Sequence, residues 1–309
     1  MGSVIVLGAK GRFGRAAVQA FHQAGWQVSA FGRGLDRKAF PQVRCIEGDA
    51  QDANALSKAC AGMDVIVNSL NPPYPDWPKS MPILTGSVIA AAKVTGATVL
   101  IPGNVYNYGA DMPAVLNEQT PWRPTTRKGK LRVEMEQAFR DAGVRTIVLR
   151  CGDFFESEDS GDWFSHHISA KSHLGQTLYP GPLDLVHAWA YLPDVARAAV
   201  ALAEKRAEFT NMEEFAFPGY GVTGRQQMDE IARVLGLAQR HKGLPWPMLR
   251  LLGIFAPLMR EVHEMRYLWQ VPHRIDGGKM ASVLPDFEAT TFSHAVREAL
   301  ARKITLMEN

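Results

Sequence analysis

Apolar residues in the first 150 positions form short runs that alternate with segments of helical periodicity. Six runs rich in β-branched residues predict buried strands at Ser3–Leu7, Trp26–Phe31, Val43–Glu47, Asp64–Ser69, Ala97–Ile101 and Val144–Leu149. Apolar positions spaced three and four residues apart predict helices at Arg15–Ala24, Ala53–Ala61, Ile83–Thr95 and Arg127–Ala142. Five prolines between Leu70 and Pro82 favour an irregular loop there. Strands that alternate with helices predict an α/β fold built on a doubly wound parallel sheet.

The second half of the chain is less regular. Its pattern predicts helices at Trp163–Lys171, Pro193–Lys205 and Gly224–Leu235, an extended segment at Leu183–Ala190 and a short strand at Phe215–Phe217. We therefore expect residues 1–150 to form a larger domain, to which residues 186–217 return. Residues 151–185 and 218–309 are then left to form a smaller C-terminal lobe.

Composition excludes several classes of protein. A net charge of +3 does not indicate a nucleic-acid partner, because a basic groove needs a cluster of cations and not a small surplus. Three scattered cysteines are too few for a disulfide framework or a metal site. The most apolar late stretch, Pro245–Met259, contains three prolines and Arg250, so it is too short and too broken to cross a bilayer. Because the N-terminus enters a strand at once, we expect a cytoplasmic protein with no membrane partner.

Three regularly spaced glycines, Gly8, Gly11 and Gly14, follow the first predicted strand and lead into the first predicted helix. Gly8 permits a sharp turn, Gly11 lets backbone N–H groups approach a pyrophosphate, and Gly14 lets the helix pack against the strand. The N-terminus of the helix carries partial positive charge, which favours phosphate. This order of elements predicts a Rossmann-type dinucleotide site, and Arg12 and Phe13, between the last two glycines, belong to it.

The end of the second predicted strand bears on the choice of cofactor. Sites that prefer NAD carry an acidic residue there, which binds the ribose 2′-OH, and Gly32-Arg33-Gly34 contains none. The guanidinium of Arg33 suits a 2′-phosphate by charge and geometry. Arg33 could instead be a solvated turn residue, but beside the glycines it favours NADP, with NAD as the second option.

These features resemble the extended short-chain dehydrogenase/reductase family, which includes nucleotide-sugar epimerases and dehydratases. The resemblance rests on the three glycines, on Gly48-Asp49 after the third predicted strand and on Val105-Tyr-Asn-Tyr-Gly109 after the fifth. It continues with Lys130-x-x-x-Glu134, Val148-Leu-Arg150 and Tyr191-Leu-Pro-Asp194-Val-Ala, and it covers roughly the first 205 residues. The resemblance implies that Asp49 and Ala50 face the adenine, that Leu70 lies along the cofactor, and that Lys130 binds the nicotinamide ribose hydroxyls.

The chain departs from this family at its active site. The family uses Tyr-x-x-x-Lys, in which a tyrosinate transfers the proton and the lysine lowers the pKa of that tyrosine. Four residues before Lys130 stands Thr126, whose aliphatic hydroxyl does not ionise usefully at neutral pH. The chain thus resembles a subgroup that lacks the tyrosine. The family's substrate-orienting Ser or Thr corresponds to Asn104, whose amide can still donate a hydrogen bond to a carbonyl.

Three other side chains could supply the missing proton-transfer group. Tyr106 lies two residues beyond Asn104, and we hypothesise that it is the base, with the charge of Lys130 lowering its pKa; packing beneath the lobe is the alternative. His187 has a near-neutral ordinary pKa, although a lone histidine in an apolar strand is more often a core residue. Asp153 follows the sixth strand, and a solvated carboxylate in an acidic segment is its alternative interpretation.

Two classes of function are open from the sequence. The first is an NADP-binding oxidoreductase or epimerase-like enzyme that acts on a small hydroxyl or carbonyl substrate, nucleotide sugars included. The second is a non-catalytic NADP-binding sensor or scaffold, which the loss of the family tyrosine would suit. The resemblance also implies a homodimer whose helices 83–95 and 127–142 pair across a two-fold axis through Ile89, Ala92, Met135 and Phe139.

Overall fold

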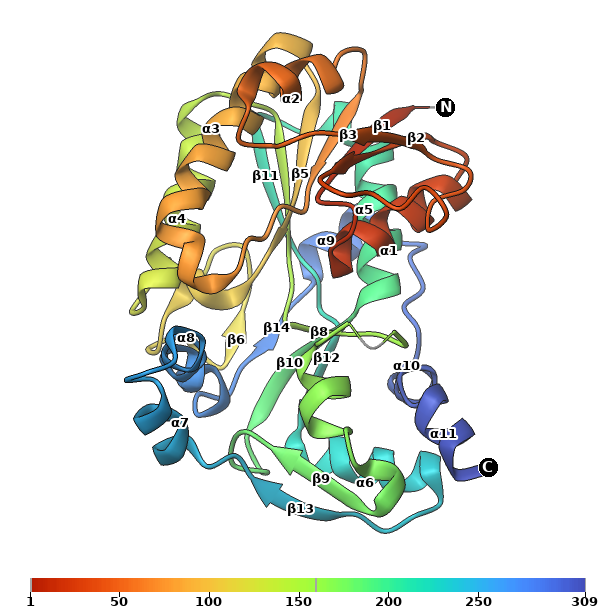
Figure 1. The fold of residues 1–309 in the computed structure, drawn as a ribbon, viewed down its shortest axis with the longest axis vertical. Coiled ribbons are helices and arrows are strands. Elements are labelled where there is room, and N and C mark those ends of the chain that lie inside the picture. Colours follow the sequence, from red (N-terminus) through yellow and green to blue (C-terminus); the bar gives the residue numbers. More distant parts are fainter. Residues whose placement is uncertain (1, 159, 309) are drawn as a thin grey trace.

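The computed structural model describes residues 2–158 and 160–308, and its centre is a parallel sheet of seven strands (Figure 1). The strand order is β11-β7-β5-β4-β1-β2-β3. The bounds are β1 Ser3–Leu7, β2 Gln27–Gly32, β3 Arg44–Glu47, β4 Val65–Asn68, β5 Thr98–Gly103, β7 Thr146–Arg150 and β11 Met212–Ala216. The six strands expected in the first half are all present, and β11 extends the sheet beyond them.

Helices cover both faces of this sheet (Figure 1). One face carries α1 (Arg12–Gln23) and α5 (Leu192–Glu204), and the other carries α2 (Ala53–Ala59), α3 (Trp77–Thr95) and α4 (Arg127–Asp141). Successive residues of a strand point to opposite faces, so Val4 and Val6 belong to the first core and Ile5 and Leu7 to the second. The fold is the Rossmann-type doubly wound sheet that the hydrophobic pattern predicts.

The direction in which the chain winds reverses at β1. This strand pairs with β2 on one side, through Leu7 opposite Phe31, and with β4 on the other, through Leu7 opposite Asn68. From β1 the chain first builds β2 and β3 outward, and then crosses back to β4, β5 and β7. In an open parallel sheet such a reversal leaves a crevice beyond the carboxyl ends of the strands, where ligands bind.

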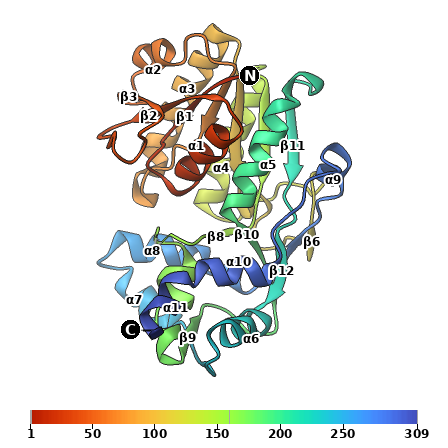
Figure 2. The same ribbon diagram turned by 90° about the vertical axis from the view of Figure 1, so that its right-hand side faces the viewer.

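The smaller lobe lies below the carboxyl ends of the large sheet (Figure 2). Its strand β10 (Val186–Tyr191) pairs parallel with β8 (Asp153–Phe155) and antiparallel with β12 (Tyr220–Thr223), while β9 (Gln176–Tyr179) pairs with β13 (Arg240–Gly243). The helices are α6 Gly224–Leu235, α7 Trp246–Leu252, α8 Pro257–Glu264, α10 Phe292–Ala299 and α11 Ala301–Glu308. An aromatic core that includes Phe155, Trp189 and Trp269 holds the lobe together.

Later parts of the chain return to the larger domain. Of the expected segment 186–217, α5 packs on α1 and β11 pairs with β7, whereas β10 lies in the sheet of the smaller lobe. The helix α9 (Gly278–Val283) also packs against β11. A two-stranded pairing of β6 (Val115–Leu116) with β14 (Arg274–Ile275) ties the tail to the loop after β5.

Three local predictions were wrong. The proline-rich segment 70–82 is not all loop, because α3 begins at Trp77; Pro78 lies in its first turn, where no intrahelical N–H bond is lost. The first helix begins at Arg12 rather than Arg15. The expected helix at 163–171 is a single π turn, Phe164–Ile168.

The side chains expected at a dimer interface are mostly used inside one chain. Ala92, Met135 and Phe139 are buried in the core beneath α3 and α4, and Ile89 packs against the same core. The outward face of α4 carries polar side chains such as Glu134 and Gln137 instead. These four residues therefore do not form an apolar dimer surface.

Within the part of the chain that the structure describes, no helix is long and apolar enough to cross a membrane. Residues 2–158 and 160–308 also contain no cluster of three or more His, Cys, Asp or Glu side chains that could hold a metal ion.

Candidate functional site

The glycine turn between β1 and α1 is built for close approach. Gly8 has a φ of +74°, its N–H donates to the carbonyl of Phe31 at 3.0 Å, and its own carbonyl accepts from the N–H of Gly11 at 2.9 Å. A Cβ on Gly14 would lie 2.3 Å from the carbonyl oxygen of Gly8, so no larger residue fits. The first turn of α1 has neither a side-chain cap nor an acidic residue. These features fit a dinucleotide pyrophosphate at the helix N-terminus.

Arg12 and Phe13 differ in their environments. Phe13 is buried, and its ring stacks on that of Phe154 with centroids 6.3 Å apart, so it packs between α1 and β8. Its ring is therefore part of the core, and its contact with the cofactor, which its backbone N–H in the first turn of α1 could make, stays a prediction. Arg12 is partly exposed, and its charge acts on Tyr74 and Asp162 across the crevice.

Four charged side chains meet at the end of β2. Arg33 is exposed and lies 3.8 Å from Asp49, and Lys10 in the glycine turn donates to the carbonyl of Gly34 at 3.1 Å. The carboxylate of Glu47 accepts from the N–H of Gly34 at 2.5 Å, and hydrogen bonds from the backbone hold its pKa below the ordinary value. The sequence argument overlooked Lys10 and Glu47, because only the sheet brings them to the same strand end.

The other residues expected along the cofactor line the same side of the crevice. Asp49 is exposed and accepts a hydrogen bond from the N–H of Gln51 at 3.0 Å. Ala50 is buried, and Leu70 packs partly buried against the core beneath α3. Their contacts with adenine and with the cofactor chain stay predictions.

The start of α4 places its charged residues differently from the sequence expectation. Thr126 is the N-cap, and its hydroxyl accepts from the N–H of Gly129 at 3.0 Å. Lys130 is exposed, whereas Lys128 and Arg132 are buried. Two residues along a helix correspond to a rotation of about 200°, so Lys130 points away from the face that holds Lys128. The structure therefore does not bring Lys130 to Tyr106.

The inward pair with the family's four-residue spacing is Lys128 and Arg132. The guanidinium of Arg132 donates to the carbonyl of Pro102 at 2.6 Å, and its Nε has no hydrogen-bond partner within the described residues. Burial lowers the pKa of Arg132. The sequence itself indicates this orientation of α4. Phe139 and Met135 are four residues apart on the buried face, and continuing that face by three and then four residues toward the N-terminus leads to Arg132 and then Lys128.

Lys128 is held by carboxylates from the tail. Its Nζ lies 2.5 Å from Glu261 and also contacts Glu264, and Lys128 and Glu261 are each only 1% exposed. The backbone N–H of Arg127 donates to Glu264 at 2.6 Å, and its guanidinium pairs with Glu261. These contacts fasten α8 to the N-terminus of α4. Lys128 also lies 5.2 Å from the ring centroid of Tyr74.

The phenols of Tyr106 and Tyr74 are hydrogen-bonded to each other at 3.0 Å. Burial raises the pKa of Tyr106 well above its ordinary value, and the charges of Tyr74 and Asp153 raise it further. The expected lowering by Lys130 is wrong, because that lysine faces outward. Nor does Tyr106 continue the strand: β5 ends at Gly103, and Tyr106 lies in the 3₁₀ turn Val105–Tyr108.

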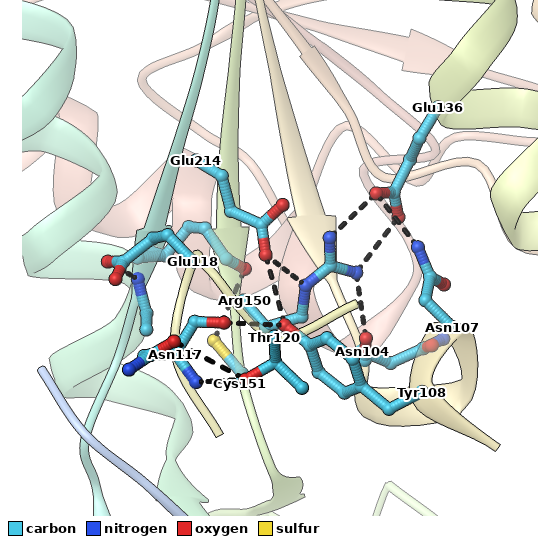
Figure 3. Close-up of polar contacts among 12 residues, drawn as sticks. Asn104, Asn107, Tyr108, Asn117, Glu118, Thr120, Glu136, Arg150, Cys151 and Glu214 are labelled. Atoms are coloured by element: carbon cyan, nitrogen blue, oxygen red, sulfur yellow. Dashed lines mark hydrogen bonds and ion pairs between the residues drawn. The ribbon is translucent and has the colours of Figure 1, made fainter. Parts of the chain in front are cut away.

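Asn104 is fixed from two sides. Its side-chain oxygen accepts from the N–H of Tyr106 at 3.0 Å, and its carbonyl accepts from Nη1 of Arg150 at 2.8 Å. Figure 3 shows the guanidinium of Arg150 between the carboxylates of Glu136 and Glu214, which it contacts at 2.7 and 2.8 Å. This buried network ties α4, β7 and β11 to the loop after β5 and so positions Asn104 and Tyr106.

Asp153 and His187 form a hydrogen-bonded pair, and the charge of Asp153 acts on the phenols of Tyr74 and Tyr106. The Oδ2 of Asp153 lies 2.9 Å from Nε2 of His187, and Nδ1 of His187 lies 3.2 Å from the carbonyl of Leu268. The imidazole stacks on Trp269 with centroids 4.2 Å apart. Both ring nitrogens face oxygens, so both hydrogen bonds form only when a proton lies between His187 and Asp153. The alternative interpretations from the sequence, a core histidine for His187 and a solvated carboxylate for Asp153, therefore do not describe this pair.

Comparisons with known proteins agree with this geometry. A family model described as NAD(P)H-binding matches residues 8–171. None of the curated protein sequences matches the chain. Many solved structures share the fold of this chain, and three of them serve as examples.

The first of the three is a protein from Burkholderia cenocepacia J2315 proposed to be an epimerase, with a TM-score of 0.78, 16% identity and 98% coverage of both chains. A UDP-glucose 4-epimerase from Brucella ovis in complex with NAD has a TM-score of 0.76 and 15% identity, covering 98% of this chain and 99% of that one. A UDP-glucose 4-epimerase from Bifidobacterium longum in complex with NAD+ and UDP has a TM-score of 0.75 and 14% identity, covering 97% and 98%. At these identities the likeness establishes the fold.

Proposed function

The chain belongs to the family of NAD(P)H-binding proteins, and on this basis we propose that it is an NADP-dependent oxidoreductase or epimerase-like enzyme for a small hydroxyl or carbonyl substrate. The observation that carries the proposal is the uncapped, glycine-lined N-terminus of α1 at the switch point of the sheet. The likeness in fold to UDP-sugar epimerases includes nucleotide sugars among the candidate substrates.

Two cations support the preference for NADP. Lys10 and Arg33 come from different elements to the end of β2, where the ribose 2′ position of the cofactor lies in this fold. Glu47 and Asp49 lie close by, but Glu47 is occupied by the backbone N–H groups of Gly34 and Leu35. A charge-assisted hydrogen bond to the phosphate contributes roughly 1.5–3 kcal/mol, or about ten- to a hundredfold in affinity.

Calorimetric titration of NADPH and NADH tests this preference. We expect Lys10→Ala and Arg33→Ala each to weaken NADPH by at least about tenfold and to leave NADH nearly unchanged. Arg37→Ala is the matched control, because Arg37 is exposed on the same loop beyond this cluster. Equal affinities of the wild-type protein for the two cofactors would refute the NADP assignment while leaving cofactor binding intact.

The proton-transfer groups of the proposed enzyme are Asp153 and His187. When bound, the nicotinamide supplies or accepts a hydride at the substrate carbon. The proton shared by Asp153 and His187 is then available to the substrate oxygen, either directly or through the hydroxyl of Tyr106. Burial keeps Tyr106 neutral, so in this proposal it donates a hydrogen bond and does not act as a phenolate.

The test begins with a screen of aldehydes, ketones and nucleotide sugars for oxidation of NADPH. We expect Asp153→Asn to lower kcat by about 10²–10⁴, the usual contribution of a general base. Lys128→Gln and Lys130→Gln separate the two registers of α4, and we expect only the variant of the inward lysine to lose activity. An Asp153→Asn protein with full kcat would remove this pair from the mechanism.

The second candidate function is a non-catalytic NADP-binding sensor or scaffold. It is favoured by Thr126, which serves as a helix cap where the family tyrosine is expected. Tight binding of NADPH without turnover of any substrate class would favour this function.

A further inference from the structure

One corner of the smaller lobe exposes an unusual concentration of apolar side chains. Among the described residues, twelve large apolar side chains are exposed, and six of them lie within the eleven positions from 248 to 258. These six are Met248, Leu251, Leu252, Ile254, Phe255 and Leu258. Phe255 and Ile254, at the tip between α7 and α8, are 85% and 69% exposed. A concentration of exposed apolar side chains of this kind marks an interaction site.

The corner is firmly attached to the rest of the molecule through its inner side. Trp246 at the start of α7 is buried, and its Nε1 donates to the carbonyl of Pro180 at 2.6 Å. Glu261 and Glu264 of α8 bind Lys128 at the start of α4. Figure 1 shows α7 and α8 at the lower left edge of the molecule, directly below α4. The apolar side chains are therefore presented outward by anchored helices.

The exposed charges of residues 240–260 have a single sign, whereas the adjoining Glu261 is buried and contacts Arg260 at 3.8 Å. Residues 240–260 contain Arg240, Lys242, Arg250 and Arg260 and no Asp or Glu, although the whole chain has 34 basic and 31 acidic residues. All four basic residues are exposed. Exposed apolar side chains flanked by Lys and Arg are the pattern of a segment that lies in a membrane interface, where anionic headgroups attract the cations.

We propose that residues 240–260 bind the surface of an anionic lipid bilayer, with Ile254 and Phe255 inserted among the headgroups. A second copy of this chain fits less well, because a two-fold contact through this corner would bring its cations against their own copies, and Glu261, which contacts Arg260, is buried and already paired with Lys128. The inference rests on this surface alone and does not depend on the proposed function. It also extends the sequence argument, which considered only whether Pro245–Met259 could cross a bilayer.

Co-sedimentation with vesicles, without cofactor, tests the proposal. We expect the full-length protein to bind vesicles of phosphatidylcholine and phosphatidylglycerol, to bind phosphatidylcholine alone much more weakly, and to dissociate as salt is raised. The double variant Ile254→Ser/Phe255→Ser should lower the vesicle partition coefficient by about tenfold or more. Lys242→Glu/Arg250→Glu should abolish the preference for phosphatidylglycerol.

One control variant and a check of folding accompany this experiment. Val94→Ser removes a side chain that is 77% exposed on α3, away from this corner, and should leave vesicle binding unchanged. Circular dichroism and NADPH titration report whether each variant is folded. Absence of vesicle binding by the wild-type protein, or binding that survives the Ile254→Ser/Phe255→Ser change, would overturn the proposal. A dimer in light scattering that dissociates in the same variant would also overturn it, by assigning the corner to contact between copies.

Discussion

The buried network around Arg150 gives the most specific prediction about stability. The side chains of Arg150 and Glu136 are fully buried, and two contacts join them, at 2.7 and 3.0 Å. Glu214, which is 12% exposed, adds a third contact at 2.8 Å. The substitution Glu136→Gln keeps the shape of the side chain but removes its charge. It also turns an amide N–H₂ toward donors of Arg150 or Asn107, since the Nδ2 of Asn107 donates to Glu136 at 3.0 Å.

Removing one partner of a buried ion pair costs about 3–5 kcal/mol, and we expect the lower value, about 3 kcal/mol, because Glu214 still compensates Arg150. A domain of ordinary stability, about 5–15 kcal/mol, would remain folded after this loss. Urea unfolding followed by circular dichroism measures the change in the free energy of unfolding. Hydrogen exchange should also accelerate at Asn104–Tyr106, because Arg150 holds the carbonyl of Asn104.

The exposed pair Arg225–Asp184 provides the matched control. Its N–O distance is 3.1 Å, but the two side chains are 59% and 78% exposed. Asp184→Asn should therefore cost no more than about 1 kcal/mol. If Glu136→Gln costs as little as this control, the reasoning that burial makes the Arg150 network important to stability is wrong.

Two further predictions concern other buried groups. Burial lowers the pKa of His273 to about 3 from an unfolded value of 6.5, so the unfolded chain takes up the proton first and stability falls as the pH drops from 6.5. At pH 5 the loss from this group is about 2 kcal/mol relative to pH 7, and urea titrations at both pH values should show a smaller pH effect in His273→Gln. Burial raises the pKa of Cys60 to about 12 and also raises that of Cys151, whereas Cys45 is only partly buried. A thiol reagent such as DTNB should therefore modify Cys45 alone in the native protein and all three cysteines in denaturant; rapid modification of a second thiol in the native state would contradict this burial.

The larger domain could be predicted because its signals are local. Each strand of the first half is a short apolar run, and each turn or helix lies between two such runs. The glycine turn could be recognised for the same reason, since the positive φ of Gly8 and the close approach at Gly14 depend on neighbours within a few residues. The sequence by itself therefore determined the parallel sheet and the position of the cofactor turn.

The chemistry of the crevice was decided by the tertiary structure. Asp153 and His187 are 34 residues apart, and the parallel pairing of β8 with β10 brings them together. The start of α4 offers two registers with the same four-residue spacing, Thr126 with Lys130 and Lys128 with Arg132. Packing of the helix on the sheet turns the second pair inward. The spacing is the same in both registers, so the choice depends on which face of the helix is buried against the sheet, and that face continues from Phe139 and Met135 to Arg132 and Lys128.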